Sequence, residues 1–190
     1  VMRPLMQTGQ AAGTAANLAR KYGTTPRCIY EKHIKELQQE LLKDGCYLPG
    51  VTNQDKNDLA LSANITASSC LKDMDPAKVA NGWNRVLDSD RNAWAPNLDS
   101  PGPHWLKMSL EKTVRINTIH VTSEEQCADF RVEAYVRDNW RRIAQVNGNR
   151  DRRVVLRFDP VHTRQIRLVA TGAHKHFVLC EVRLYSEGQL

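Results

Sequence analysis

VRINTIHV, residues 114–121, alternates roughly between apolar and polar side chains. Successive side chains of a β-strand point to opposite faces of a sheet, so this pattern predicts a strand with one face on a core and the other in water. Similar runs occupy residues 105–110, 130–136, 165–169 and 178–185. The predicted turns between them are Asp138-Asn139, Asn147-Gly148-Asn149, Asp159-Pro160 and Thr171-Gly172. Short strands with no helices between them predict an all-β sandwich over residues 59–187.

The first 50 residues follow a different, helical pattern. Thr8 is a suitable N-cap for a first helix rich in glycine and alanine, and Gly23 followed by Pro26 ends it. A second helix is predicted from Pro26 to Lys43, with apolar residues at helical spacing. Residues 51–58 are polar and rich in turn formers, which predicts a linker. Two helices of this size cannot enclose a core, so we expect them to pack against another part of a protein.

Composition and charge narrow the classes of partner. Of the 190 residues, 41% are hydrophobic and 25% are charged, and the formal net charge is +6. No apolar run approaches the ~18 residues of a membrane span, so we expect none. Arginines of the second half could bind nucleic acid or an acidic polysaccharide. Because no nucleic-acid motif accompanies them, we expect solvated strand faces and no nucleic-acid partner.

The sequence offers no convincing catalytic constellation, and we predict no catalytic residue. Its six histidines are scattered apart from His174 and His176, and the serine nucleophile motif G-x-S-x-G is absent. The five cysteines include no C-x-x-C pair. Their spacing therefore favours buried structural thiols over a zinc site or a disulfide framework.

The β segment resembles the discoidin-like, galactose-binding-like modules of the coagulation-factor type C fold. The resemblance lies in the order of several short motifs over some 125 residues. They are Ala63–Ser69, Val79–Gly82, Asp88–Trp94, His104–Leu110, Trp140–Ala144, Arg164–Leu168 and Glu181–Tyr185. The resemblance implies a jelly-roll β-sandwich, preceded here by the two-helix segment.

The same resemblance implies two kinds of binding site. Such modules often hold a structural Ca²⁺, and the corresponding positions here are Asn81, Asp88, Asp90 and Glu181. Asn81 replaces the usual aspartate, and residues 83–87 look inserted. Sugar binding in such modules uses loop aromatics with polar neighbours. The candidates are Trp83, Asn97, Arg150, His174 and His176, while Trp94 and Trp105 occupy family core positions. The alternative for Trp83 is packing under the inserted loop.

The opening stretch is similar to the C-terminal end of bacterial FAD-dependent oxidoreductases, a group in which some members are labelled xanthan lyases. In that family a Gly-Ala helix approaches the cofactor with its N-terminus. The corresponding residues are Gly9, Gln10, Ala11, Ala12 and Gly13. The dinucleotide-binding G-x-G-x-x-G is absent, so we expect a C-terminal fragment, 1–50, that cannot bind FAD without its missing flavin domain. The resemblance implies a bacterial protein and leaves open a periplasmic or secreted location.

These observations leave three functions open. In the first, a fragment of a FAD-dependent oxidoreductase carries a sandwich module that binds carbohydrate. In the second, the module is a structural or assembly unit without a ligand. In the third, and least favoured, it is a polysaccharide lyase.

Overall fold

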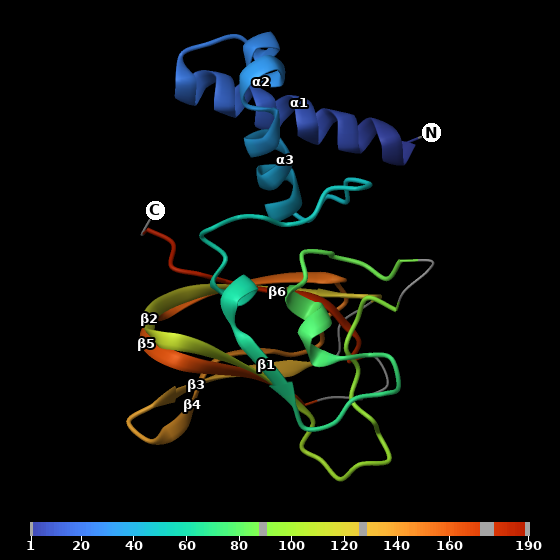
Figure 1. Ribbon diagram of the computed structural model, residues 1–190, viewed down its shortest axis with the longest axis vertical. Helices are drawn as coiled ribbons and strands as arrows, with labels where there is room; N and C mark the ends of the chain where they lie inside the picture. Colours follow the sequence, from blue (N-terminus) through green and yellow to red (C-terminus); the bar gives the residue numbers. More distant parts are fainter. Residues whose placement is uncertain (1, 88–90, 126–128, 172–176, 189–190) are drawn as a thin grey trace. The chain divides into compact units, whose positions relative to one another are not determined.

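The structure is a computed structural model that describes residues 2–87, 91–125, 129–171 and 177–188. The chain divides into a helical unit, Val1–Asp55, and a β unit, Lys56–Leu190 (Figure 1). Their boundary falls inside the predicted linker 51–58. No described helix has the length and apolarity needed to cross a bilayer.

The helical unit contains three helices: α1 (Met2–Tyr22), α2 (Pro26–Lys32) and α3 (Ile34–Lys43). Both shorter helices pack on α1. A small core forms where they meet, made of Leu18, Ala19 and Ile29 with Ala15 and Leu37 at its edge. Pro26 stands in the first turn of α2, and the Thr25 side chain caps that helix by accepting the Cys28 N–H.

Two expectations for this unit are wrong. The first helix begins at Met2, so Thr8 is inside it and caps nothing. The predicted second helix breaks at His33, whose backbone (φ −128°, ψ 19°) lies outside the helical region. The His33 ring stacks on Tyr22 of α1 at 4.2 Å between centroids, and Glu36 accepts from the Tyr22 hydroxyl. This tertiary contact overrides local helix propensity at the break.

The β unit is a sandwich built from six antiparallel strands: β1 (Asn64–Ala67), β2 (Trp105–Ser123), β3 (Phe130–Val136), β4 (Asn139–Val146), β5 (Arg153–Ala170) and β6 (Leu179–Tyr185). Two short 3₁₀ turns, Leu59–Ser62 and Pro76–Ala80, precede β2. The strands β2 and β5 pair along most of their length and serve both layers. Five strands form one layer in the order β1-β2-β5-β3-β4. In the other layer, β6 pairs with residues 118–123 of β2, whose opposite edge pairs with the first part of β5. The predicted mainly-β fold class is confirmed.

The long strands contain bulges where the sequence predicted breaks. Ile116 pairs with Val161 and Thr118 with Arg157, so residues 158–160 stand opposite a single residue of β2. The predicted turn Asp159-Pro160 is therefore wrong: Pro160, which cannot donate to the ladder, lies in a bulge of β5. The break between the predicted runs 105–110 and 114–121 is likewise an irregularity of β2. By contrast, the turn near Asp138 is confirmed as a tight hairpin.

The core of the β unit lies between the two layers and takes alternate residues of each strand. Its members include Leu106, Met108, Phe130, Leu168 and Leu184, all with 0% exposure. Trp94 is also fully buried, which confirms its predicted packing role. Trp105 is not in this core. The neighbouring Leu106 takes the inward position, so Trp105 points outward and is half-buried.

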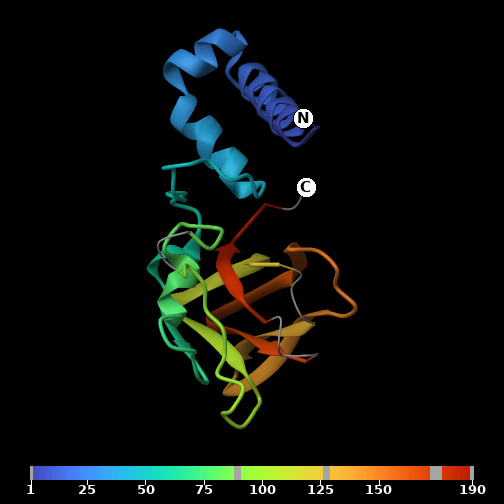
Figure 2. The same cartoon turned by 90° about the vertical axis from the view of Figure 1, so that its right-hand side faces the viewer.

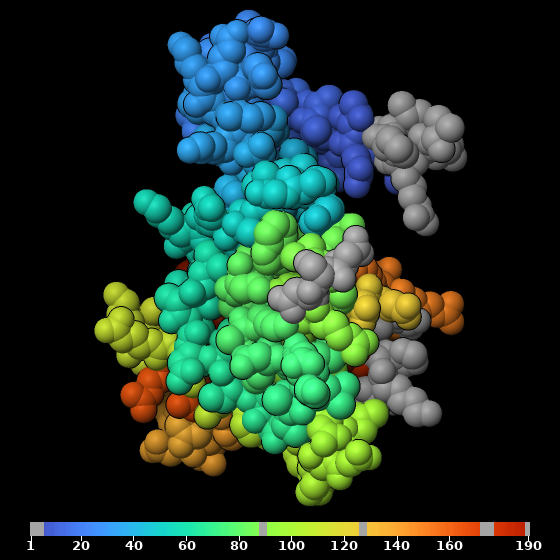
Figure 3. All heavy atoms as spheres, turned by 45° about the vertical axis from the view of Figure 1, so that its right-hand side comes forward, coloured from blue at the N-terminus to red at the C-terminus, as the bar shows by residue number. Residues whose placement is uncertain are grey.

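The loops after β2, β4 and β5 gather at one end of the sandwich, because each connects one layer to the other there. In their described parts, Ser123 N–H bonds the Arg152 carbonyl and Thr171 N–H bonds that of Asp129. This end faces the viewer in Figure 2. The described part of the segment between β1 and β2, green to yellow-green in Figure 3, covers much of the visible β unit there. We use the name loop end for the end of the sandwich where the loops after β2, β4 and β5 meet.

Candidate functional site at the loop end

Trp83 stands in the loop after Pro76–Ala80, and its backbone is fixed on both sides. Its N–H donates to Asn81 Oδ1 at 3.1 Å, and its carbonyl accepts from Asn92 Nδ2 at 3.2 Å. Asn92 is fully buried and also bonds the Arg85 carbonyl. The indole itself is half-buried. A buried asparagine therefore holds an aromatic residue at a partly open surface.

Arg152 joins the loop of Trp83 to two other loops. Its guanidinium donates through Nη2 to the Asn84 carbonyl at 2.5 Å and through Nε to the Glu124 carbonyl at 3.2 Å. Arg150 is exposed two residues earlier in the same loop. The structure thus ties the segments of Trp83 and Arg150, both predicted site residues, to a common anchor. Arg152 itself was missed, because nothing in the sequence separates it from the other arginines.

The loop that carries Arg150 is further held by Asp129. Asn149 N–H donates to Asp129 Oδ1 at 3.1 Å, and Gly148 adopts φ 61°, in the left-handed region that glycine tolerates. Backbone N–H groups of Gly148 and Asn149 lower the pKa of the Asp129 carboxyl below its ordinary value. The carboxylate therefore stays ionised and fixes the turn.

Asn97 is held by a separate set of bonds. The Ser69 hydroxyl bonds both the N–H and the carbonyl of Asn97, at 3.1 and 3.3 Å. The same serine's carbonyl accepts from Trp94 Nε1 at 3.0 Å. The Asn97 side chain accepts from Asp99 N–H, which closes a turn. Its carboxamide oxygen is therefore engaged locally.

The two described members of the predicted calcium set, Asn81 and Glu181, both contact protein groups. Glu181 is 4% exposed and its carboxylate lies 2.8 Å from Arg183 Nη2, so a guanidinium balances its charge. Burial raises the pKa of the Glu181 carboxyl, and the charge of Arg183 offsets only part of that effect. Asn81 donates to Asn92 Oδ1 and accepts from Trp83 N–H. Calcium takes six to eight oxygen ligands, and the calcium site stays a prediction because two members of its set lie outside the described residues.

Four predicted site residues, Asp88, Asp90, His174 and His176, lie outside the described residues. Within the described ranges, no group of three or more histidine, cysteine, aspartate or glutamate side chains is placed to hold a metal ion. The cysteines Cys28, Cys46, Cys70 and Cys180 are free thiols. Cys180 is buried as predicted, and burial raises its pKa to about 11, whereas Cys70 is exposed.

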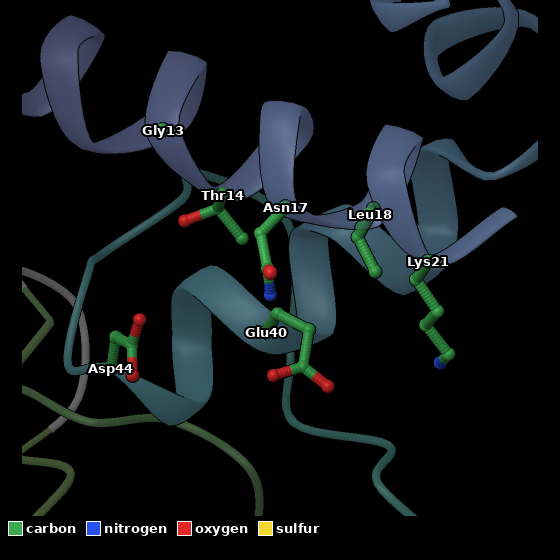
Figure 4. Close-up of a pocket in the computed structure, with 7 residues that line it drawn as sticks. All are labelled: Gly13, Thr14, Asn17, Leu18, Lys21, Glu40 and Asp44. Atoms are coloured by element: carbon green, nitrogen blue, oxygen red, sulfur yellow. The ribbon is translucent and has the colours of Figure 1, made fainter. Parts of the chain in front are cut away.

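The residues assigned by resemblance to a flavin edge, Gly9 to Gly13, lie inside α1 and not at its N-terminus. Their backbone N–H groups belong to the helical ladder, so the expected exposed donors are not there. Gly13 lines a groove of about 360 Å³ between α1 and α3 (Figure 4). The side chains of Asn17, Lys21, Glu40 and Asp44 also border this groove. The flavin association of these residues remains a prediction.

The layers and the loop end define the class of protein as a discoidin-like β-sandwich. A family model described as F5/8 type C domain matches residues 64–182, well over half of the chain, and the chain belongs to that family. No curated protein matches the sequence.

Solved structures share the fold at low sequence identity. A fucose-binding module of Streptococcus pneumoniae is 20% identical with a TM-score of 0.59, covering 70% of this chain and 99% of that one. The family 32 module of C. perfringens NanJ, solved with galactose, is 15% identical with a TM-score of 0.56, covering 68% and 98%. SpGH29 is 23% identical with a TM-score of 0.57 over 70% of this chain. The chain spans 28% of the length of SpGH29.

Proposed function

We propose that the β unit is a carbohydrate-binding module whose loop end holds the sugar, with Trp83 as the stacking surface and Arg150 as a hydrogen-bond donor. The observation that carries the proposal is the fixed backbone of Trp83, bonded at its N–H and its carbonyl. An aromatic residue whose backbone is already fixed loses less conformational entropy when a ligand stacks on its ring.

The chemistry of the two side chains suits a pyranose. An indole offers a flat apolar face to the C–H face of the sugar, and a guanidinium supplies several donors for its hydroxyl oxygens. The structural neighbours that bind galactose and fucose support the same class of ligand. Arg152 lies in the loop of Arg150, and its bonds to the Asn84 and Glu124 carbonyls hold that loop beside the loop of Trp83.

The test is a glycan array followed by calorimetric titration with galactose and fucose. We expect Trp83→Ala to weaken binding at least about tenfold, as is usual for an aromatic anchor that the ligand covers. Tyr30→Ala is the matched control, because Tyr30 is an exposed aromatic residue of the helical unit. Circular dichroism of each variant checks that the fold is kept.

Two outcomes contradict the proposal in different ways. If the unmutated chain binds no glycan, the module is a structural or assembly unit. If it binds sugar and Trp83→Ala binds equally well, the sugar site is elsewhere on the domain.

We further propose that the helical unit belongs to the flavin domain of a FAD-dependent oxidoreductase. Along α1 a Cβ added at Gly9 or Gly13 would meet nothing within 4 Å, and Met6 is 72% exposed. This smooth, partly apolar surface suits close packing by a further domain. The test is to express the full reading frame of the source gene and record its visible spectrum. A flavin band supports the proposal, and a folded, colourless product contradicts it.

A further inference from the structure

The outer face of the five-stranded layer carries cations and aromatic rings. In the strand pairing, Lys107 stands opposite Arg167, and Glu133 stands opposite both Arg167 and Arg142. These residues alternate with core residues of the same strands, so their side chains point away from the core. One row of the sheet therefore contains three cations and one carboxylate. We call this surface the sheet face.

Glu133 organises two arginines of the sheet face. Its Oε1 accepts from Arg131 Nε and its Oε2 from Arg167 Nε, both at 2.6 Å. The carboxylate is 8% exposed, whereas the two arginine side chains are 33% and 25% exposed. Each guanidinium thus meets Glu133 through Nε. In the described part of the chain, no protein acceptor bonds the Nη atoms of either arginine, and these atoms carry the paired donors that recognise a carboxylate.

Aromatic residues hold and flank this cationic row. The Arg167 guanidinium lies 4.2 Å from the centre of the Trp140 ring, and Tyr135 packs against the same ring at 5.3 Å. At the other side, Lys107 Nζ lies 5.9 Å from the Trp105 ring. Stacking on Trp140 fixes the plane of the Arg167 fork. Arg131 and Arg167 are therefore prearranged donors within the sheet face.

The charge of the sheet face is unbalanced. Its outward paired residues include four cations, Lys107, Arg131, Arg142 and Arg167, against the single carboxylate of Glu133, a net charge of +3. The cations lie on four neighbouring strands, which are about 4.8 Å apart. A ligand that complements this surface carries several negative charges in a row.

We propose that the sheet face binds an acidic polysaccharide, a chain of sugars that carry carboxylates, with Arg131, Arg142, Arg167 and Lys107 pairing the carboxylates and Trp105 contacting a sugar ring. This surface uses neither Trp83 nor Arg150, the side chains proposed to bind sugar at the loop end. The planar, fixed guanidinium forks favour carboxylates. Single-stranded nucleic acid is disfavoured, since it needs open aromatic faces for its bases and Arg167 already covers Trp140.

The test compares polygalacturonate with the same polymer after methyl esterification, which removes its charge and keeps its backbone. Binding is measured by affinity electrophoresis and calorimetry on the full chain. We expect the acid form to bind and the ester to bind at least about tenfold more weakly, since charge-assisted bonds dominate. Binding of the acid form should also fall as the ionic strength approaches 1 M, where the Debye length is ~3 Å.

None of the variants replaces Glu133 itself, and only Arg167→Lys alters one of its bonds. Lys107→Gln with Arg142→Gln removes two cations that do not bond Glu133, and we expect about tenfold weaker binding. Arg167→Lys keeps the charge and loses the fork, and we expect a loss of severalfold. Arg141→Gln is the control. Arg141 is exposed and lies in β4 like Arg142, but it pairs with the core-facing Ala134 and so does not belong to the sheet face.

Three results overturn the proposal: equal binding of acid and ester, equal losses in the control and the double variant, or tighter binding of a single-stranded oligonucleotide than of polygalacturonate. Trp83→Ala separates this proposal from the proposed function. It should weaken binding of neutral sugars at least about tenfold and leave polygalacturonate binding unchanged, so that either site can fail without the other.

Discussion

Glu133 combines a buried position with a carboxylate that stays ionised. Burial alone would raise its pKa, but the Nε–H bonds and the charges of Arg131 and Arg167 hold the pKa of this carboxyl below its ordinary value of 4.5. The sequence could not reveal this role. In the sequence Glu133 is one of several carboxylates among the arginines of the second half, and its burial depends on strands distant in the chain.

The lowered pKa of Glu133 gives stability a defined pH dependence. A folded-state pKa below the unfolded one means that folding favours the ionised form; the stabilisation is present above the unfolded pKa and is lost as pH falls through the folded pKa. We expect Glu133→Gln to lower the free energy of unfolding at pH 7 by about 1–3 kcal/mol. The difference in unfolding free energy between this variant and the unmutated protein should shrink as the pH falls below 4.5, the ordinary pKa of the carboxyl. Urea unfolding from pH 3 to pH 7 measures it, and a pH-independent difference would contradict the assignment.

The strand β6 is buried along its whole length and places a polar row on one of its faces. Val182 and Leu184 enter the core, whereas Glu181 and Arg183 lie on the opposite face with Tyr185. Arg183 is 1% exposed and is bound to Glu181 at 2.8 Å. Two charges removed from water in this way stabilise a fold only as a pair.

The pair in β6 predicts a clear double-mutant result. Glu181→Gln leaves a buried guanidinium without its counter-charge and should cost about 3–5 kcal/mol of unfolding free energy. Replacing both residues, Glu181→Leu with Arg183→Met, should cost less than Glu181→Gln alone. Chemical unfolding followed by fluorescence compares both variants with the unmutated protein. A cost below about 0.5 kcal/mol for Glu181→Gln would show that the pair contributes little.

At the scale of elements, the alternating pattern predicted the strands well and their ends poorly. Runs such as 130–136 and 178–185 became β3 and β6 nearly as expected, because period-two patterning reports which side chains face a core. Asp159-Pro160 was predicted as a turn and is a bulge, because β5 stays paired with β2 on both sides of it. The loop end was predicted in part: Trp83 and Arg150 could be named from the sequence, but the linking Arg152 could not.

In the described residues, the two units have cores of very different size. The helical unit buries Leu18, Ala19 and Ile29, whereas the core of the β unit draws on all six strands and Trp94. A small core supplies little hydrophobic stabilisation, so the two units should differ in stability. The sequence showed two unlike segments but not this imbalance, because the size of a core depends on contacts between strands far apart in the chain.

Thermal unfolding of the full chain should therefore show two transitions. All four tryptophans, Trp83, Trp94, Trp105 and Trp140, lie in the β unit, so their fluorescence follows that unit alone. The far-ultraviolet helix signal follows residues 1–55, since the described part of the β unit contains strands and short 3₁₀ turns. We expect the helix signal to disappear at the lower temperature, and a chain of residues 56–190 to keep the fluorescence transition of the full protein. Coincident transitions, or an unfolded β unit after removal of residues 1–55, would mean that the two cores stabilise each other and that the β unit does not fold as a domain of its own.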